Sequence, residues 1–116
     1  MAEHERLICA ASELAEQGKG VRFELIRYGQ PQLAFVVRFD GQPRAFLNQC
    51  GHVPVELDWQ EGEFFDDSRL YLICSTHGAL YHPASGQCVG GRCAGRGLIP
   101  VPVVERDGHV YLLETD

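Results

Sequence analysis

The chain has 116 residues, 45% of them hydrophobic, which is the length and apolar content of one folded domain and not of a disordered segment. Its 16 acidic and 10 basic residues give a net charge of -6, which argues against nucleic acid as a partner, because phosphates need a basic surface. No apolar run approaches the roughly 20 residues that span a bilayer, and the polar residues after Met1 lack the pattern of a signal peptide. We therefore expect a soluble cytoplasmic protein with no membrane partner.

The first expected element is one short N-terminal helix within residues 6–20. Ser12 is a suitable N-cap for a helical turn over residues 13–16, and Gly18 is a suitable stop signal. A helix this short is stable only when it packs against the rest of the domain.

Antiparallel strands are expected next. From Val21 apolar residues alternate with polar ones, the pattern of a strand with one side facing solvent. The pattern repeats over residues 33–39, and Asp40 with Gly41 predicts a tight hairpin turn into a third strand at 44–47.

Further strands are expected in the second half of the chain. Residues 70–73 are an apolar strand, and residues 99–103 form another. Pro100 and Pro102 lie two apart on the latter, so their missing N–H groups face one side, which must be a sheet edge. Residues 106–113 close the chain as a hairpin.

Two cysteine–histidine pairs occur in the middle of the chain in the same order. Cys50 and His52 form the first pair, Cys74 and His77 form the second, and 21 residues separate the pairs. Two thiolates and two imidazoles suit a tetrahedral zinc site, or a cluster of two irons with the cysteines on one iron and the histidines on the other. Either way, these four residues are the expected ligands of one metal centre.

The expected fold class is all-β, in a single domain spanning residues 1–116. An antiparallel β-sandwich or barrel base comprises about residues 1–46 and 97–116, and an inserted β lobe at about 47–96 carries the metal ligands. The short N-terminal helix is the one helix expected.

The ligand pattern resembles the signature of the Rieske 2Fe-2S family. Cys50-x-His52 and Cys74-x-x-His77 match its two ligand loops. Further matches extend the resemblance over about residues 21–113: Gly78, Tyr81, residues 83–86 and the Gly90-Gly91 pair. The resemblance implies a Rieske-type 2Fe-2S cluster held by these cysteines and histidines, and it favours iron–sulfur over zinc.

Several residues differ from those of the respiratory branch of that family, and these differences affect the expected redox potential of the cluster. Two cysteines that form a disulfide there are matched here by Val55 and Thr76, and a serine that donates to a bridging sulfide is matched by Ala79. Pro54 also lacks an N–H, although Tyr81 matches a family hydroxyl that bonds a ligand cysteine. Fewer donors to sulfur stabilise the reduced cluster less, so the resemblance implies a potential near the low end of the Rieske range, roughly -150 mV.

The remaining cysteines are Cys9, Cys88 and Cys93. In a reducing cytosol we expect three free thiols, with Cys9 in the core. The alternative is that Cys88 and Cys93 form a redox pair near the metal centre.

An acidic segment lies between the ligand pairs. Residues 53–68 contain six acids and no Lys or Arg. The segment is either a docking surface for a basic redox partner or an ordinary solvated face, and salt-dependent electron transfer would favour docking.

The resemblance implies three possible functions. The first is an electron carrier that passes one electron from a flavin-dependent reductase to a terminal oxygenase or similar reductase, as in aromatic-ring dioxygenase systems. The second is a small Rieske-like subunit of a larger oxidoreductase such as nitrite reductase, and the third is a redox-sensing or regulatory module. We prefer the first, with no catalytic site and no small-molecule substrate of its own, because 116 residues leave no room for a separate non-haem iron domain.

Overall fold

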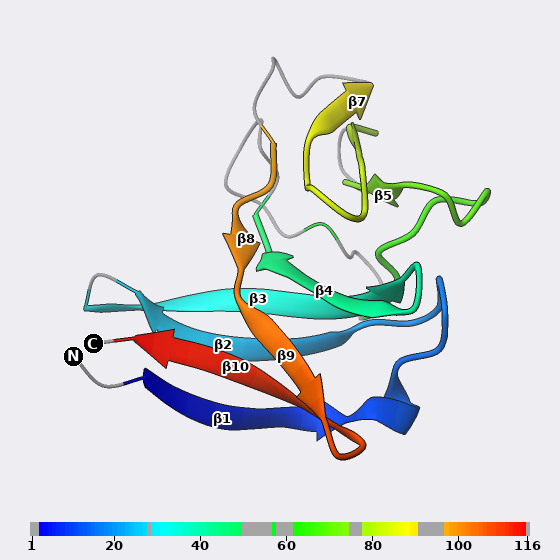
Figure 1. Ribbon diagram of the computed structural model, residues 1–116. Helices are drawn as coiled ribbons and strands as arrows, with labels where there is room; N and C mark the ends of the chain where they lie inside the picture. Colours follow the sequence, from blue (N-terminus) through cyan, green and yellow to red (C-terminus); the bar gives the residue numbers. More distant parts are fainter. Residues whose placement is uncertain are drawn as a thin grey trace.

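The structure, a computed structural model, describes residues 3–27, 29–49, 57, 62–74, 78–90 and 97–115. The elements in chain order are β1 (Glu3–Ala10), η1 (Ala11–Glu13), β2 (Val21–Arg27), β3 (Gln30–Phe39), β4 (Gln42–Leu47), β5 (Leu72–Ile73), β6 (Leu80–Tyr81), β7 (Cys88–Gly90), β8 (Pro100–Val101), β9 (Val103–Arg106) and β10 (His109–Thr115). All the strand pairings within the sheets are antiparallel, which confirms the all-β fold class (Figure 1).

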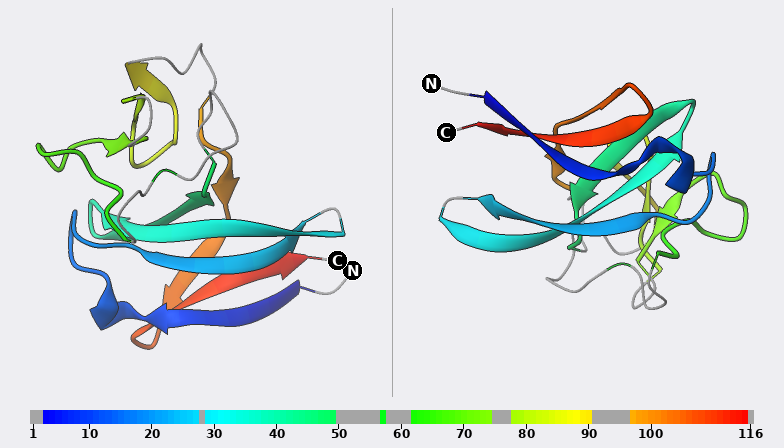
Figure 2. Two further views of the ribbon diagram at one scale, coloured as in Figure 1. Left: turned by 180° about the vertical axis from the view of Figure 1, so that it is seen from behind. Right: turned by 90° about the horizontal axis from the view of Figure 1, so that it is seen from below.

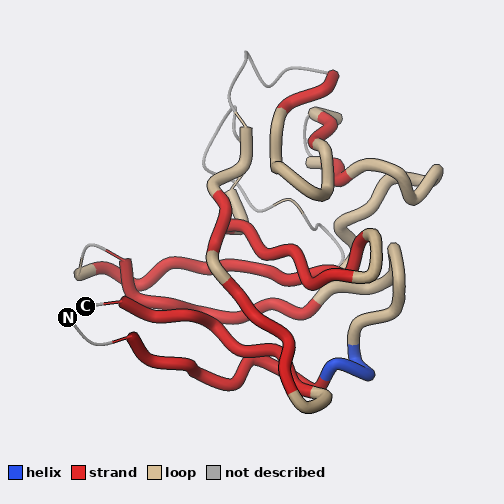
Figure 3. The backbone as a smooth tube through the Cα atoms, in the orientation of Figure 1, coloured by secondary structure: helices blue, strands red, loops and turns tan. Residues whose placement is uncertain are grey.

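The strands form three sheets. Sheets β1-β10-β9 and β2-β3-β4-β8 make the two layers that we call the base sandwich. The third sheet, β5-β6-β7, lies on the other side of the β2-β3-β4-β8 sheet, and we call it the lobe sheet (Figures 1 and 2). Its strands are only two or three residues long, so turns and loops make up most of this region (Figure 3).

Strand β3 lies between two hydrophobic cores. Ala34 and Val36 belong to the base core, which fills the space between the two layers of the sandwich. Phe35 and Val37 point to the opposite side and belong to the lobe core, which also contains residues of the lobe sheet. The expectation of one solvent-facing side is therefore wrong for this part of β3, because the β1-β10-β9 sheet covers the face of Ala34 and Val36, which alternation alone leaves to water.

The N-terminal segment differs from its prediction. Residues 3–10 form strand β1, paired with β10 at the other end of the chain, and the expected helix is reduced to the single 3-10 turn η1. The turn ends because Leu14 has an extended backbone, with φ -107° and ψ 97°, and Glu16 forms an isolated bridge with Arg38 of β3. The Arg38 guanidinium also donates to the carbonyls of Ala11 and Leu14 at 3.2 and 2.8 Å, which holds this segment against β3.

The predicted tight turns are confirmed. Asp40 and Gly41 have φ values of 55° and 73° in the β3–β4 hairpin, and Asp107 and Gly108 have 53° and 78° in the β9–β10 hairpin. Such left-handed pairs match the twist of two-residue hairpins.

The strand expected at 99–103 is divided at Pro102. Its first part, β8, is the last strand of the β2-β3-β4-β8 sheet, and its second part, β9, is the last strand of the β1-β10-β9 sheet. Both parts therefore lie at sheet edges, as the prolines require. No helix among the described residues has the length and apolar content needed to cross a membrane.

Candidate metal centre

The second ligand loop starts from a fully buried cysteine. Cys74 follows β5 directly, has 0% of its surface exposed and forms no disulfide. Its backbone N–H donates to the carbonyl of Ala79 at 2.9 Å, and its carbonyl accepts from the N–H of Gly78 at 2.7 Å. These bonds join the two ends of the loop that contains His77, a residue outside the described part of the chain.

Aromatic side chains hold this loop against the base sandwich. Phe64 stacks on Phe35 of β3 with ring centroids 3.9 Å apart, and its carbonyl accepts the N–H of Ile73 at 2.9 Å. Phe65 pairs with Leu72 in an isolated bridge. Phe64 and Phe65 are buried core residues, and they set the position from which Cys74 emerges.

The first ligand loop is described only at its two ends. Asn48 comes directly after β4, and Leu57 is fully buried in the lobe core. The side-chain oxygen of Asn48 accepts the Leu57 N–H at 2.8 Å. Cys50 and His52 lie between these residues, outside the described part. The motifs in the sequence do not single out Asn48. The available signal for a buried polar side chain here is an amide directly after the apolar residues 45–47.

The glycine-rich segment spans residues 90–97, of which 91–96 lie outside the described part, and its flanks belong to the lobe. Leu98, which follows it, is a lobe-core residue whose N–H donates to the carbonyl of Gly86 at 2.7 Å. Cys88, which precedes it, packs against the same core.

Cys88 is disulfide-bonded, so the expectation of a free thiol at this position is wrong. Its bonding partner lies outside the described residues, since neither Cys9 nor Cys74 forms a disulfide. The expectation relied on the reducing conditions of a cytosol. Those conditions do not indicate which sulfur atoms the folded chain brings within bonding distance. Val55 and Thr76, where the respiratory family has its disulfide, are not cysteines, so this bridge has a different location.

Cys9 is the core residue that the sequence predicted. It is 5% exposed in the base core. Burial, assisted by the nearby Glu13 carboxylate, raises the pKa of its thiol to about 11. The thiol therefore stays protonated and unreactive at neutral pH.

Two histidines outside the ligand pairs are exposed: His82 directly follows β6, and His109 is the first residue of β10. The Nδ1 of His82 accepts the N–H of Ala84 at 3.1 Å, and its ring meets the ring of Phe39 edge-on at 6.1 Å. A ring nitrogen of His109 lies 3.1 Å from the carbonyl of Asp107. Both rings have local structural contacts, and neither belongs to a group of potential metal ligands within the described ranges.

The residues that flank both ligand loops and the glycine-rich segment meet in one place. Phe46 and Leu57 flank the first loop, Cys74 and Ala79 the second, and Leu98 follows the third segment, and all five belong to the lobe core. An apolar environment suits an oxidised cluster of this type, whose two ferric ions, two sulfides and two thiolates cancel in charge. The buried thiol of Cys74 and this shared core fit the predicted ligand set.

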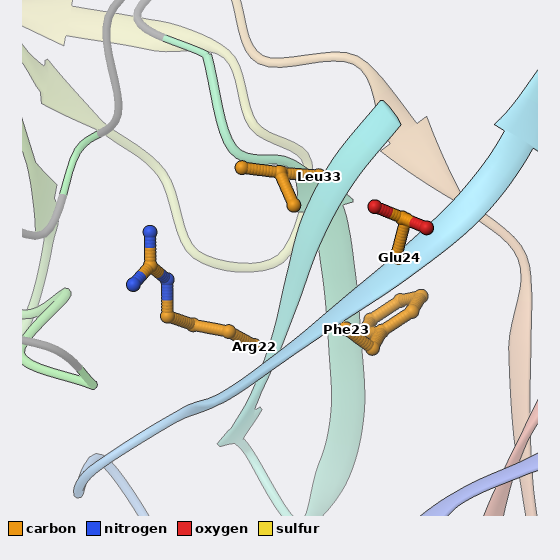
Figure 4. A pocket seen from close by; sticks show the side chains of 4 residues that line it. All are labelled: Arg22, Phe23, Glu24 and Leu33. Carbon is orange, nitrogen blue, oxygen red and sulfur yellow. The ribbon is translucent and has the colours of Figure 1, made fainter. Parts of the chain in front are cut away.

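A shallow hollow of about 360 Å³ lies on the base sandwich, lined by Arg22, Phe23, Glu24 and Leu33 (Figure 4). All four come from β2 and β3. The hollow therefore shares no lining residue with the loops that flank Cys74.

The chain resembles proteins of known structure along almost its whole length. The Sphingomonas yanoikuyae B1 ferredoxin is 20% identical, with 97% of this chain and 100% of that chain covered and a TM-score of 0.70. A chain in the complex of reduced oxygenase and oxidized ferredoxin in carbazole 1,9a-dioxygenase is 21% identical, with 93% and 91% covered and a TM-score of 0.70. These matches confirm the all-β fold.

A longer chain contains the same fold as one part. The terminal oxygenase of carbazole 1,9a-dioxygenase from Novosphingobium sp. KA1 is 24% identical, with a TM-score of 0.68 over 98% of this chain but 30% of that chain. No curated protein matches the chain in sequence.

The family comparison agrees with the metal centre. The model of the Rieske [2Fe-2S] domain matches residues 4–105. The cofactor is therefore a Rieske-type 2Fe-2S cluster, and the chain belongs to the Rieske [2Fe-2S] domain family.

Proposed function

We propose that this protein is a Rieske-type ferredoxin, an electron carrier without a catalytic site of its own. The observation that carries the proposal is the shared lobe core, in which the flanks of both ligand loops and the buried thiol of Cys74 meet. A 2Fe-2S cluster at that point accepts and releases one electron. The rigid core beneath it keeps the ligands in place in both redox states.

The proposed ligands are Cys50 and Cys74 for one iron and His52 and His77 for the other. Cys74 starts from β5, whose backbone is bonded to Phe64, and this anchoring supports a fixed ligand position. We further propose the division into a base at about residues 1–46 and 97–116 and a cluster-binding lobe at about 47–96.

The proposed midpoint potential is near the low end of the Rieske range, roughly -150 mV. Ala79 supports this value because it is fully buried next to the Cys74 loop and its methyl side chain donates no hydrogen bond to a bridging sulfide.

The proposed partners are a flavin-dependent reductase as electron donor and a terminal oxygenase or similar reductase as acceptor, in the cytoplasm. Support for the acceptor comes from the similarity to a chain of the oxygenase–ferredoxin complex in carbazole 1,9a-dioxygenase. The donor is proposed from the family resemblance alone.

Absorption and electron paramagnetic resonance (EPR) spectra of histidine variants test the ligand assignment. We expect His52→Ala and His77→Ala each to abolish the Rieske spectrum, because either change removes a nitrogen ligand from the iron that the two histidines bind. The folded base should survive, as shown by an unchanged far-ultraviolet circular dichroism spectrum. Iron and acid-labile sulfide in equal amounts should accompany the wild-type spectrum.

The matched control is His82→Ala. His82 lies in the same region of the chain but is exposed and bonded to Ala84, so this variant should keep the full spectrum. A Rieske spectrum that persists in His52→Ala or His77→Ala would show the assignment to be wrong. A colourless wild-type protein that contains zinc would refute the iron–sulfur function itself.

A further inference from the structure

Asn48 is a buried amide at the start of the first ligand loop. It is 2% exposed, and among the described residues it is the one polar side chain that is buried. Burying an amide is unfavourable unless it is hydrogen-bonded, so its position at the boundary between β4 and the loop requires a specific partner.

The partner is on the far side of the loop. The Oδ1 atom of Asn48 accepts the backbone N–H of Leu57 at 2.8 Å, and Leu57 is fully buried. A buried backbone N–H outside a strand needs an acceptor, and Asn48 supplies it. This single bond therefore joins the two ends of residues 49–56, the eight residues that contain Cys50 and His52.

Both ends of this bond are held by the fold. The N–H of Asn48 donates to the carbonyl of Leu33 at 2.8 Å, and the N–H of Leu47 donates to the carbonyl of Ile99 at 2.9 Å, so Asn48 is fixed to the base sandwich. Leu57 packs in the lobe core with Cys74. The bond thus connects the sheet that precedes the first loop to the core that holds the second loop.

We propose that Asn48 is the positioning residue for the first ligand loop, setting the distance of Cys50 and His52 from Cys74. This inference rests on the proposed function, since it assumes that the loop carries two cluster ligands. Closing the loop through the Asn48 side chain reduces the conformations open to residues 49–56, so the ligands are held ready for the cluster. Without the bond, the loop samples more conformations and releases the cluster faster.

The test compares variants at positions 48 and 49. Asn48→Leu keeps the side-chain size but removes the acceptor, and Asn48→Ser keeps a polar group that is too short to reach the Leu57 N–H. Asn48→Asp retains the acceptor oxygen. Gln49→Leu is the matched control because Gln49 is the exposed neighbouring amide, whose side chain bonds only to Gln32 among the described contacts, at 3.4 Å.

Three measurements are made on the purified, cluster-loaded proteins: the rate of cluster loss to an iron chelator, the EPR g-values and hydrogen exchange at the Leu57 amide. We expect Asn48→Leu and Asn48→Ser to lose the cluster about tenfold faster than wild type, the effect of one buried hydrogen bond. Their g-values should shift and the Leu57 amide should exchange faster. Asn48→Asp and Gln49→Leu should stay within about threefold of wild type.

An unchanged rate of cluster loss and unchanged g-values in Asn48→Leu would overturn the proposal. If Asn48→Leu does not fold, the smaller Asn48→Ser variant decides by the same criterion. Loss from Asn48→Asp as fast as from Asn48→Leu would also overturn it, since the acceptor is still present. Failure of the proposed function is distinguishable, because it would show in the wild-type spectrum before any variant is compared.

Discussion

Gly86, in the lobe, lies against the ring of Phe46 from β4 of the base sandwich. Its φ is 78°, and a Cβ atom added there would lie 2.7 Å from Cε1 of Phe46 and 3.1 Å from the carbonyl oxygen of Leu98. Any other residue is therefore opposed both by the left-handed backbone conformation and by a clash with β4.

We expect Gly86→Ala to lower the free energy of unfolding by about 1–3 kcal/mol from backbone strain and about 1–3 kcal/mol from overpacking. Gly41→Ala is the control: its φ is 73°, but no atom lies within 4 Å of the added Cβ, so only the strain remains. Urea unfolding of both variants provides the measurement. Equal destabilisation of the two would show that the contact between Gly86 and Phe46 is unimportant.

Single residues also show how far the sequence predicts the site. The ligand pairs were recognisable because the residue types and their spacing along the chain are local properties. The roles of Asn48 and Gly86 were not, since each depends on a partner from another segment, Leu57 for Asn48 and Phe46 for Gly86.

At the scale of elements, the disulfide of Cys88 constrains the strand that leads into the glycine-rich segment. Cys88 belongs to β7 and pairs with Tyr81 of β6, so the bridge begins at the edge of the lobe core. We expect Cys93 to be its partner, because neither Cys9 nor Cys74 forms a disulfide and Cys50 is a proposed cluster ligand. Peptide mass spectrometry without reduction should therefore find Cys88 linked to Cys93.

Breaking this bridge should destabilise the lobe modestly. A short disulfide-closed loop contributes about 2 kcal/mol, so the wild type should unfold at lower urea concentration after treatment with a phosphine reductant. Cys88→Ser should already be less stable and should not respond to the reductant. A free Cys88 thiol in the native protein, or a link to Cys50, would contradict this prediction.

Elements differ in how well they could be predicted. The β3–β4 and β9–β10 hairpins followed from their Asp-Gly pairs, because turn conformation is a property of those two residues. The expected helix is reduced to one turn because the backbone becomes extended at Leu14, and Glu16 then forms a bridge with Arg38 of the distant strand β3. The strand at 99–103 was correct as an edge but not as one element, since each half pairs with a different sheet.

At the scale of the whole molecule, the net charge of -6 bears on partner recognition. Of the described acids in the segment before β5, Asp67 is exposed and Glu63 and Asp66 are half-buried. If this face docks a basic redox partner, the rate of electron transfer should fall several-fold between about 0.05 and 0.5 M salt.

Stopped-flow measurement with the partner protein checks this expectation. Asp67→Asn should weaken the salt dependence, whereas Asp107→Asn should leave it unchanged, because Asp107 is an exposed acid at the β9–β10 turn of the base sandwich. A rate that does not depend on salt would identify the acidic segment as an ordinary solvated surface.

The sequence by itself determined the hairpin turns and the all-β class, and it supplies the proposed ligand types, since each depends on residues close together in the chain. The tertiary structure alone decided the rest. It paired β1 with β10, buried β3 on both sides and brought the Cys88 sulfur to a disulfide partner. These features are contacts between segments that are distant in the sequence. Their formation depends on the packing of the whole domain, so local sequence patterns do not predict them.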